Sequence, residues 1–147
     1  MSTLAKSGNE VATWAEYALD RLSEAGYRSG GSRRKVVELI GSQNCAITAF
    51  ELDDQLVGVG RATVYRALEQ MDELGLIQKI DVGRDSAGYE KVDPEGHHHH
   101  HIVCTGCGKV VPFEDKKLEE AIHRVSERDG FKIQHHDITL KGTCKDC

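Results

Sequence analysis

Four cysteines near the carboxyl end of the sequence form two Cys-x-x-Cys pairs, Cys104 with Cys107 and Cys144 with Cys147. A Cys-x-x-Cys turn brings two thiolates to one ion, and two such pairs complete a tetrahedral shell with no open position. Glycines suit tight turns around an ion, and they lie beside both pairs at Gly106, Gly108 and Gly142. The spacing indicates a structural zinc site, which stabilises the fold and performs no chemistry.

Paired cysteines also occur in disulfides and in redox centres. The segment from Met1 to Trp14 lacks the apolar stretch of a secretory signal, and no segment is long enough to span a bilayer. We therefore expect a cytoplasmic protein without membrane contact, in a reducing compartment. In that compartment, zinc ligation is favoured over a disulfide or a thiol oxidoreductase.

Five consecutive histidines, His97 to His101, follow the turn Asp93-Pro94-Glu95-Gly96 and precede the apolar pair Ile102-Val103. The run is internal, whereas an expression tag is normally terminal. If residues 97–103 form one strand, the odd-numbered histidines face one way and the even-numbered ones the other. One strand can thus serve two separate metal sites. The alternative, a solvated polar strand, would pack five imidazoles poorly at a sheet edge.

Hydrophobic periodicity predicts four helices before about residue 75. Ser32 is expected to cap the second helix, and Thr48 with Glu51 forms a capping box for the third, which carries Leu52, Leu56 and Val57. The fourth helix runs from Arg61 to Leu74, with Gly75 as its stop. Together the helices are expected to bury one small core.

The fourth predicted helix has the features of a DNA-recognition helix. Arg61, Tyr65 and Arg66 lie outside its apolar stripe. Two apolar runs, at 76–82 and 89–92, predict a two-stranded wing after it, and helices plus such a hairpin make a winged helix-turn-helix. From periodicity alone, Tyr65 could equally pack in the core.

The formal net charge is −5 at pH 7, so a local patch must carry any nucleic-acid binding. The stretch 28–35 contains basic residues and no acidic ones: Arg28, Arg33, Arg34 and Lys35. This stretch fits either a DNA-binding arm or an ordinary solvated loop and helix start.

The composition changes beyond Asp93-Pro94 to histidine, cysteine and alternating strands. We therefore predict a winged-helix DNA-binding domain at 1–83, a hinge at 84–96 and a metal-binding dimerisation domain at 97–147. The last should contain strands at 97–103, 109–113 and 131–140 and a helix at 116–129, whose apolar stripe should face inward: Leu118, Ala121, Ile122 and Val125. The expected fold class is α+β, an N-terminal winged helix-turn-helix with a small C-terminal α/β domain. That domain buries little apolar surface, so zinc and a second copy of the chain must make up the shortfall.

With these parts in place, the sequence resembles the ferric uptake regulator (Fur) family of bacterial metal-responsive repressors over nearly its whole length. Three segments carry the resemblance: Gly60 to Arg66 in the recognition helix, His97 to Lys109, and Gly142 to Cys147. The resemblance implies a homodimer that, when loaded with metal, binds a double-stranded DNA operator of two-fold symmetry and blocks transcription.

The resemblance also implies ligand sets. The structural zinc ligands are Cys104, Cys107, Cys144 and Cys147; a second metal site takes His98, His100, Glu119 and His136; a sensing site between the domains takes Glu90, His99 and His101. The expected DNA contacts are Arg28, Arg33 and Arg66 at the backbone or minor groove, and Arg61 and Tyr65 at base edges, with Thr63 on the same helix.

The sensing site departs from the family pattern at Ala46, where a histidine is common, and at Pro112, where a glutamate is common. Cys45 could replace the missing ligand, or it could be a small apolar filler. Asp81 and Asp93 are other candidates. The regulatory ion is therefore expected to be a divalent metal, with Fe²⁺, Zn²⁺ and Mn²⁺ all open.

Other functions remain to be weighed. A metalloenzyme would need an open metal position and a base, but Glu119 is better explained as a ligand and no nucleophile motif appears, so we expect no enzyme. A cytosolic metal buffer would leave the recognition helix without a role. A peroxide sensor of the same family stays open, because iron held by histidine and carboxylate can oxidise its own ligands.

Overall fold

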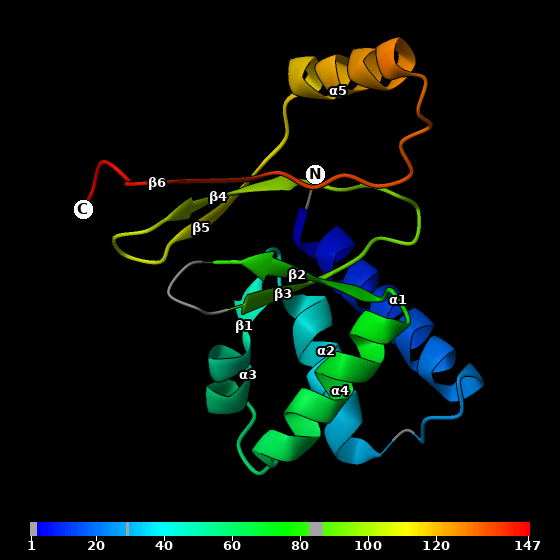
Figure 1. Cartoon of the computed structure of the whole chain (residues 1–147). Helices are drawn as coiled ribbons and strands as arrows, with labels where there is room; N and C mark the ends of the chain where they lie inside the picture. Colours follow the sequence, from blue (N-terminus) through cyan, green and yellow to red (C-terminus); the bar gives the residue numbers. More distant parts are fainter. Residues whose placement is uncertain (1–2, 29, 83–86) are drawn as a thin grey trace. The chain divides into compact units, whose positions relative to one another are not determined.

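The computed structural model describes residues 3–28, 30–82 and 87–147, with the backbone alone for 3–13. It divides the chain into two compact units, Met1–His98 and His99–Cys147, and each contains a three-stranded sheet (Figure 1). The α+β class predicted from the sequence is confirmed. Within the described part of the chain, no helix is both long and apolar enough to cross a membrane.

The first unit has a helical core. Its helices are α1 (Thr3–Glu24), α2 (Gly31–Ser42), α3 (Ala49–Gln55) and α4 (Arg61–Glu73). The apolar positions recur at helical spacing and are buried, among them Trp14, Leu22, Val37, Ile40, Leu52, Leu68 and Met71. Val57 was wrongly placed in this core: it is 86% exposed, because α3 ends at Gln55.

The helix ends follow local chemistry. The Thr48 hydroxyl accepts a hydrogen bond from the Glu51 N–H, and the Glu51 carboxylate accepts one from the Thr48 N–H, both at 3.1 Å, which confirms the predicted capping box. The predicted cap at Ser32 is wrong: extended Gly30 is the cap residue and α2 begins at Gly31, which leaves Ser32 inside the first turn. Gly75, at φ +70°, follows α4 as predicted.

The predicted wing is part of a larger sheet. Strands β2 (Ile77–Asp81) and β3 (Ala87–Lys91) pair antiparallel, and β1 (Ile47–Thr48), which the sequence did not reveal, pairs with the other edge of β3. The wing turn at 83–86 lies outside the described residues. Because β3 pairs on both sides, residues 87–91 of the predicted hinge belong to this sheet; the hinge itself stays a prediction.

Gly88 lets this sheet close. A β-carbon there would lie 2.9 Å from both the Ala46 β-carbon and the Val82 Cγ1, which is too close for a real contact. The end of β3 is also fixed from two sides, since the Lys91 ammonium donates to the Gly41 carbonyl at 2.8 Å and the Trp14 indole donates to the Val92 carbonyl at 3.1 Å. The strand that carries Glu90 is therefore anchored to two helices.

The second unit places β4 (His100–Cys104) between β5 (Val110–Phe113), which is antiparallel to it, and β6 (Thr139–Gly142), which is parallel. Helix α5 (Lys116–Asp129) has the predicted bounds, with Asp115 accepting from the Leu118 N–H and Gly130 ending it at φ +71°. The strands predicted at 97–103 and 131–140 are too long. The chain after α5 first turns back, with the Phe131 N–H bonded to the Ser126 carbonyl, and joins the sheet late.

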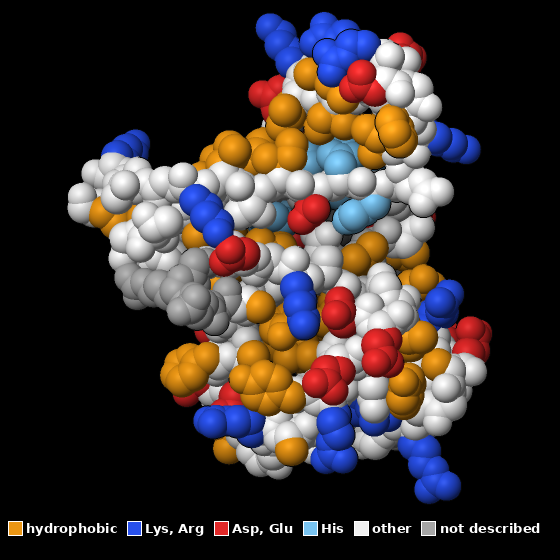
Figure 2. All heavy atoms as spheres, in the orientation of Figure 1, with side chains coloured by type: hydrophobic (Ala, Val, Ile, Leu, Met, Phe, Trp, Pro, Cys, Tyr) orange, Lys and Arg blue, Asp and Glu red, His pale blue; other side chains and the backbone are white. Residues whose placement is uncertain are grey.

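The second unit leaves much apolar surface exposed. Helix α5 has no buried residue, although its apolar stripe was expected to face inward. Large hydrophobic side chains are at least 40% exposed at Ile102, Val111, Val125, Phe131, Ile133 and Leu140. Figure 2 shows apolar side chains gathered on the visible face of this unit, near α5 at the top of the view. Much of the apolar surface of this unit is therefore exposed to solvent in the single chain.

Candidate metal centres and DNA-binding face

The four paired cysteines converge at one end of the second unit. Cys104 ends β4 and Cys144 follows β6, so the parallel pairing of these strands brings the two Cys-x-x-Cys turns together. The four sulfurs all lie within 4.8 Å of one another, with Cys104 Sγ 3.5 Å from Cys147 Sγ and Cys107 Sγ 3.8 Å from Cys144 Sγ. This grouping fits a tetrahedral Cys₄ zinc shell, as the spacing predicted.

Backbone hydrogen bonds prepare the cluster for a cation. The N–H groups of Cys107 and then Cys144 donate to Cys104 Sγ, at 3.4 and 3.3 Å, and lower the pKa of the Cys104 thiol to about 5. Hydrogen bonds with Cys144 and then Cys104 raise the pKa of the Cys147 thiol to about 12. Without metal, one sulfur is thus already a thiolate, and a neighbouring thiol donates to it.

A second group of ligands joins β4, α5 and the segment before β6. Glu119 lies between two imidazoles, with one oxygen 2.5 Å from His100 Nε2 and the other 2.7 Å from His136 Nε2. His100 is 1% exposed, and its Nδ1 accepts the Ile138 N–H at 3.1 Å, so Nε2 is the nitrogen directed at Glu119. Three of the four predicted ligands therefore meet within one unit.

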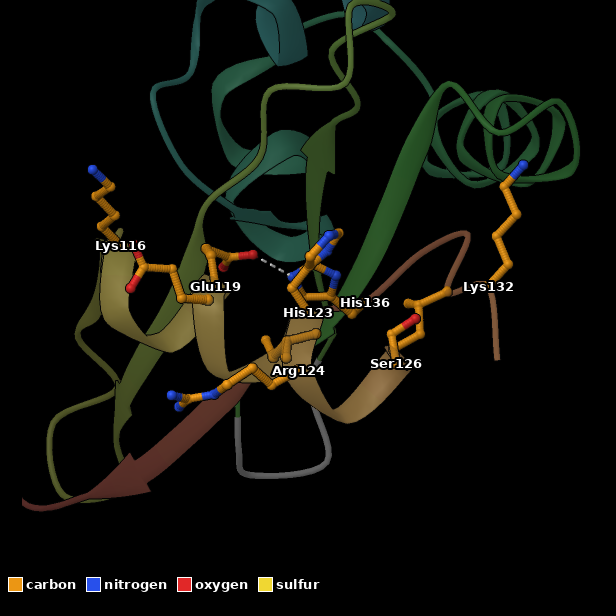
Figure 3. Close-up of a pocket in the computed structure, with 10 residues that line it drawn as sticks. Lys116, Glu119, His123, Arg124, Ser126, Lys132 and His136 are labelled. Carbon is orange, nitrogen blue, oxygen red and sulfur yellow. Dashed lines mark hydrogen bonds and ion pairs between the residues drawn. The ribbon is translucent and has the colours of Figure 1, made fainter. Parts of the chain in front are cut away.

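The charge of Glu119 suits this position. Desolvation raises the pKa of its carboxyl, but hydrogen bonds with His100 and His136 outweigh that effect and hold the pKa below its usual value. Glu119 and His136 also line an open pocket of about 740 Å³ between α5 and the segment 132–136 (Figure 3). His98, the fourth predicted ligand, lies in the other compact unit, so its part in this site stays a prediction.

The residues predicted for the sensing site form two pairs, one in each unit. In the first unit, the Cys45 sulfur lies within 4.8 Å of a Glu90 carboxylate oxygen. Glu90 is buried and accepts a hydrogen bond from the cross-strand Gln78 amide at 3.2 Å. In the second unit, the rings of His99 and His101 are 4.9 Å apart between centroids. One member of each pair lies in a strand, Glu90 in β3 and His101 in β4, whereas Cys45 and His99 lie just before β1 and β4.

The two departures from the family pattern have structural counterparts. Ala46 packs so closely against Gly88 that a β-carbon at position 88 would lie 2.9 Å from the Ala46 β-carbon. Pro112 pairs directly with His101 across the β4–β5 ladder, where side chains of paired residues share one face of the sheet. Proline is tolerated because β5 is an edge strand. A carboxylate at position 112 could reach an ion bound by His101, whereas proline offers no ligand.

The predicted recognition helix exposes the expected side chains. Tyr65 is 47% exposed, so it is not a core residue, and Arg61 has a 72% exposed side chain. The Arg61 guanidinium lies 3.4 Å from the Asp53 carboxylate of α3, a partner that the sequence gave no reason to single out. The Arg66 Nε donates to the Ala62 carbonyl at 3.3 Å, and Thr63 is half-buried on the same helix.

The basic stretch before α2 is partly held in place. The Arg33 guanidinium lies 5.8 Å from the centroid of the Tyr27 ring and donates to the Arg28 carbonyl. Tyr27 in turn donates to the Glu73 carboxylate, 3.4 Å away at the end of α4. The loop is therefore connected to the recognition helix. Its role in DNA binding stays a prediction for Arg28 and Arg33.

A further ligand group was missed from the sequence. Asp93, considered above only as a sensing ligand, groups instead with Glu95 and His97, and their ligand atoms lie within 4.8 Å of one another. The signal was present in the alternating pattern Asp-x-Glu-x-His. It was obscured because His97 was assigned to the strand, which in fact begins at His100.

Comparisons with known proteins agree with this description. The model of the ferric uptake regulator family matches residues 24–141. The ferric uptake regulation protein of Neisseria meningitidis serogroup A is 31% identical over 132 residues, which cover 86% of this chain and 90% of that protein.

Two solved structures extend the comparison. The crystal structure of the Vibrio cholerae ferric uptake regulator aligns with a TM-score of 0.75 and 30% identity, over 84% of this chain and 96% of that one. A zinc uptake regulator complexed with zinc and DNA aligns with a TM-score of 0.58 and 26% identity, over 93% and 94% of the two chains. The chain belongs to the ferric uptake regulator family and is a metal-responsive, DNA-binding regulator of transcription rather than an enzyme.

Proposed function

We propose that the protein is a dimeric repressor whose affinity for a palindromic operator is controlled by a metal ion bound jointly by its two units. The observation that supports this most directly is the division of the ligands: Cys45 and Glu90 form a pair in one unit, and His99 and His101 form a pair in the other. Neither pair offers a full shell alone, so an ion that uses both favours one orientation of the recognition helix.

The donor atoms favour zinc as the regulatory ion. One thiol, one carboxylate and two imidazoles make a four-ligand set of the kind that Zn²⁺ accepts, whereas Mn²⁺ prefers more oxygen ligands. At position 112, opposite His101, the family commonly has a glutamate, whereas this chain has proline. The ligand set therefore contains fewer oxygen atoms than is usual in the family. Structural zinc in the four-cysteine cluster is proposed as a separate, permanent ion.

The residues of the chain prepare both halves of this site. The Gln78 amide fixes the carboxylate of Glu90, and Lys91 and Trp14 hold the end of the same strand. Pairing of β4 with β5 and β6 fixes the backbone of His101. Because the Glu90 carboxylate and the His101 backbone are held before metal arrives, less ordering entropy is lost within each unit on binding.

A second copy of the chain is proposed to cover the apolar face of the second unit. Six large hydrophobic side chains of that unit are at least 40% exposed, and α5 buries none of its residues. Exposed apolar surface gathered in this way marks interaction sites. A two-fold dimer would present two copies of α4, which suits an operator with two-fold symmetry.

DNA contact is proposed through α4 and the basic loop before α2. Arg61 and Tyr65 are available for base edges, and Arg28, Arg33, Thr63 and Arg66 for the backbone or minor groove. Since the net charge is −5, affinity depends on this local patch and should fall steeply with salt. To contact DNA, the Arg61 guanidinium must give up its ion pair with Asp53. The loss of this ion pair disfavours DNA contact unless α4 is positioned to make other contacts with the operator.

The proposal is tested by fluorescence anisotropy on a palindromic operator selected from random duplexes. Protein that keeps its four-cysteine zinc is titrated with Zn²⁺, Fe²⁺ or Mn²⁺. Zn²⁺ should tighten operator binding at a lower free concentration than Fe²⁺ or Mn²⁺ does. In the Cys45→Ser variant, the difference between the Zn²⁺ and Fe²⁺ concentrations required should be smaller. Glu90→Gln should remove most of the response, whereas Glu114→Gln, at an exposed residue outside every ligand group, should not. Binding that ignores all three ions would contradict the proposal.

A further inference from the structure

His97 is left without a role by the three metal sites described so far. It belongs to the five-histidine run, yet it lies before β4 and is a member of neither ligand group that uses the other histidines. Its Nδ1 instead lies 3.0 Å from an Asp93 carboxylate oxygen and 3.9 Å from a Glu95 oxygen. These three residues are therefore a separate cluster at the end of the first unit.

The chain closes this cluster within five residues. The Glu95 N–H donates to Asp93 Oδ1 at 2.8 Å, and Gly96, at φ +86°, turns the backbone so that His97 comes back toward Asp93. A loop this short costs little entropy to close around an ion. The side chains of His97, Glu95 and Asp93 are 77%, 80% and 39% exposed, so water can fill further coordination positions.

We propose that Asp93, Glu95 and His97 form a fourth, surface-exposed metal site for a divalent transition ion of the Co²⁺, Ni²⁺ or Zn²⁺ class. One imidazole and two carboxylates supply nitrogen and oxygen donors, which these ions accept together with water. The two carboxylates attract the cation and offset its charge. Hard ions that use oxygen alone, such as Mg²⁺, gain nothing from His97. The site goes beyond the proposed function, because it uses no residue of the sensing pair in either unit.

The site should be weaker than the four-cysteine cluster and exchange its ion faster. It has three protein ligands instead of four, of which Glu95 and His97 are exposed and Asp93 is half-buried, and it has no thiolate. It is also adjacent in sequence to the histidines of the other sites, so a bound ion stiffens the segment 93–97 that leads into them.

The test is equilibrium dialysis of the whole 147-residue chain, with zinc in its four-cysteine cluster, against buffered Co²⁺. The variant Asp93→Asn/His97→Ala should bind one Co²⁺ fewer per chain than the parent at saturation, with the tighter binding steps unchanged. In the parent, the weakest Co²⁺ step should broaden the amide NMR signals of Asp93, Glu95, Gly96 and His97. Glu95→Gln should weaken that step without removing the tighter ones.

The matched control is His123→Ala/Glu127→Gln on α5, another exposed histidine and carboxylate, 4.0 Å apart but without a third ligand. It should leave the Co²⁺ count unchanged. An equal count in the parent and in Asp93→Asn/His97→Ala, or an equal loss in the control, overturns the proposal. Metal-dependent operator binding is measured on the same variants: its persistence in Asp93→Asn/His97→Ala separates this site from the sensing site, so the two proposals fail independently.

Discussion

The two units stabilise themselves in different ways. The first packs four helices and a sheet around a continuous apolar core, from Trp14 in α1 to Met71 in α4. Among the described side chains of the second unit, the buried apolar ones are Val103 and Cys104, and buried His100 and His101 lie beside them on β4. Hydrophobic burial therefore stabilises the DNA-binding unit, whereas the second unit buries few apolar side chains and is the one for which we propose stabilisation by zinc and by a second copy of the chain.

The largest expected effect comes from breaking the cysteine cluster. Cys144→Ser should release the structural zinc and abolish hydrogen-exchange protection across residues 99–147, while α2 and α4 keep theirs. Structural zinc contributes about 10–16 kcal/mol in small zinc-binding peptides, more than this unit's apolar burial can replace. Cys45→Ser, outside the cluster, should keep both zinc and protection. Intact protection of the second unit in zinc-free Cys144→Ser would show that its core suffices.

The reciprocal experiment removes apolar volume from the first unit. Leu68 is 1% exposed. Changing it to alanine should lower the free energy of unfolding by about 2–5 kcal/mol, because a cavity is left in a close-packed core. Val57→Ala, at an 86% exposed site, should stay within about 0.5 kcal/mol. Denaturant unfolding followed by Trp14 fluorescence measures both. The comparison fails if Leu68→Ala also strips zinc from the second unit.

A smaller effect concerns protons at the cysteine cluster. The pKa of Cys104 is lowered to about 5, so at pH 7 this sulfur is already ionised, and zinc binding should release about three protons instead of four. The sign follows from the shift: the thiolate is present above pH 5 and lost as pH falls through that value. Calorimetry in buffers of different ionisation enthalpy counts the protons. Release of four at pH 7 would mean that Cys104 is protonated in the zinc-free protein.

The sequence predicted most of what depends on local pattern. Helix α5, the Thr48–Glu51 capping box and the Cys₄ cluster follow from spacing and side-chain chemistry alone. Long-range pairing was harder to predict. Strand β1 is two residues long and exists because it pairs with β3, and the alternation of 131–140 is overridden by the turn after α5.

The candidate sites show the same division. His100, Glu119 and His136 come from three separate segments, and their grouping was inferred from family resemblance instead of from periodicity. Conversely, the Asp93–His97 cluster was local and still missed, because the histidine run was interpreted as one continuous strand. A run of identical ligands does not reveal which of them the strand includes.

The most direct measurement of the central claim is the zinc affinity of the sensing site, with and without operator DNA. If one ion held by both units sets the orientation of α4, operator binding must raise the protein's affinity for the ion. The factor must equal the one by which the ion raises the affinity for operator, about 5- to 150-fold for typical couplings. The account predicts this equality in protein that keeps its four-cysteine zinc. An ion affinity unchanged by saturating operator would contradict it.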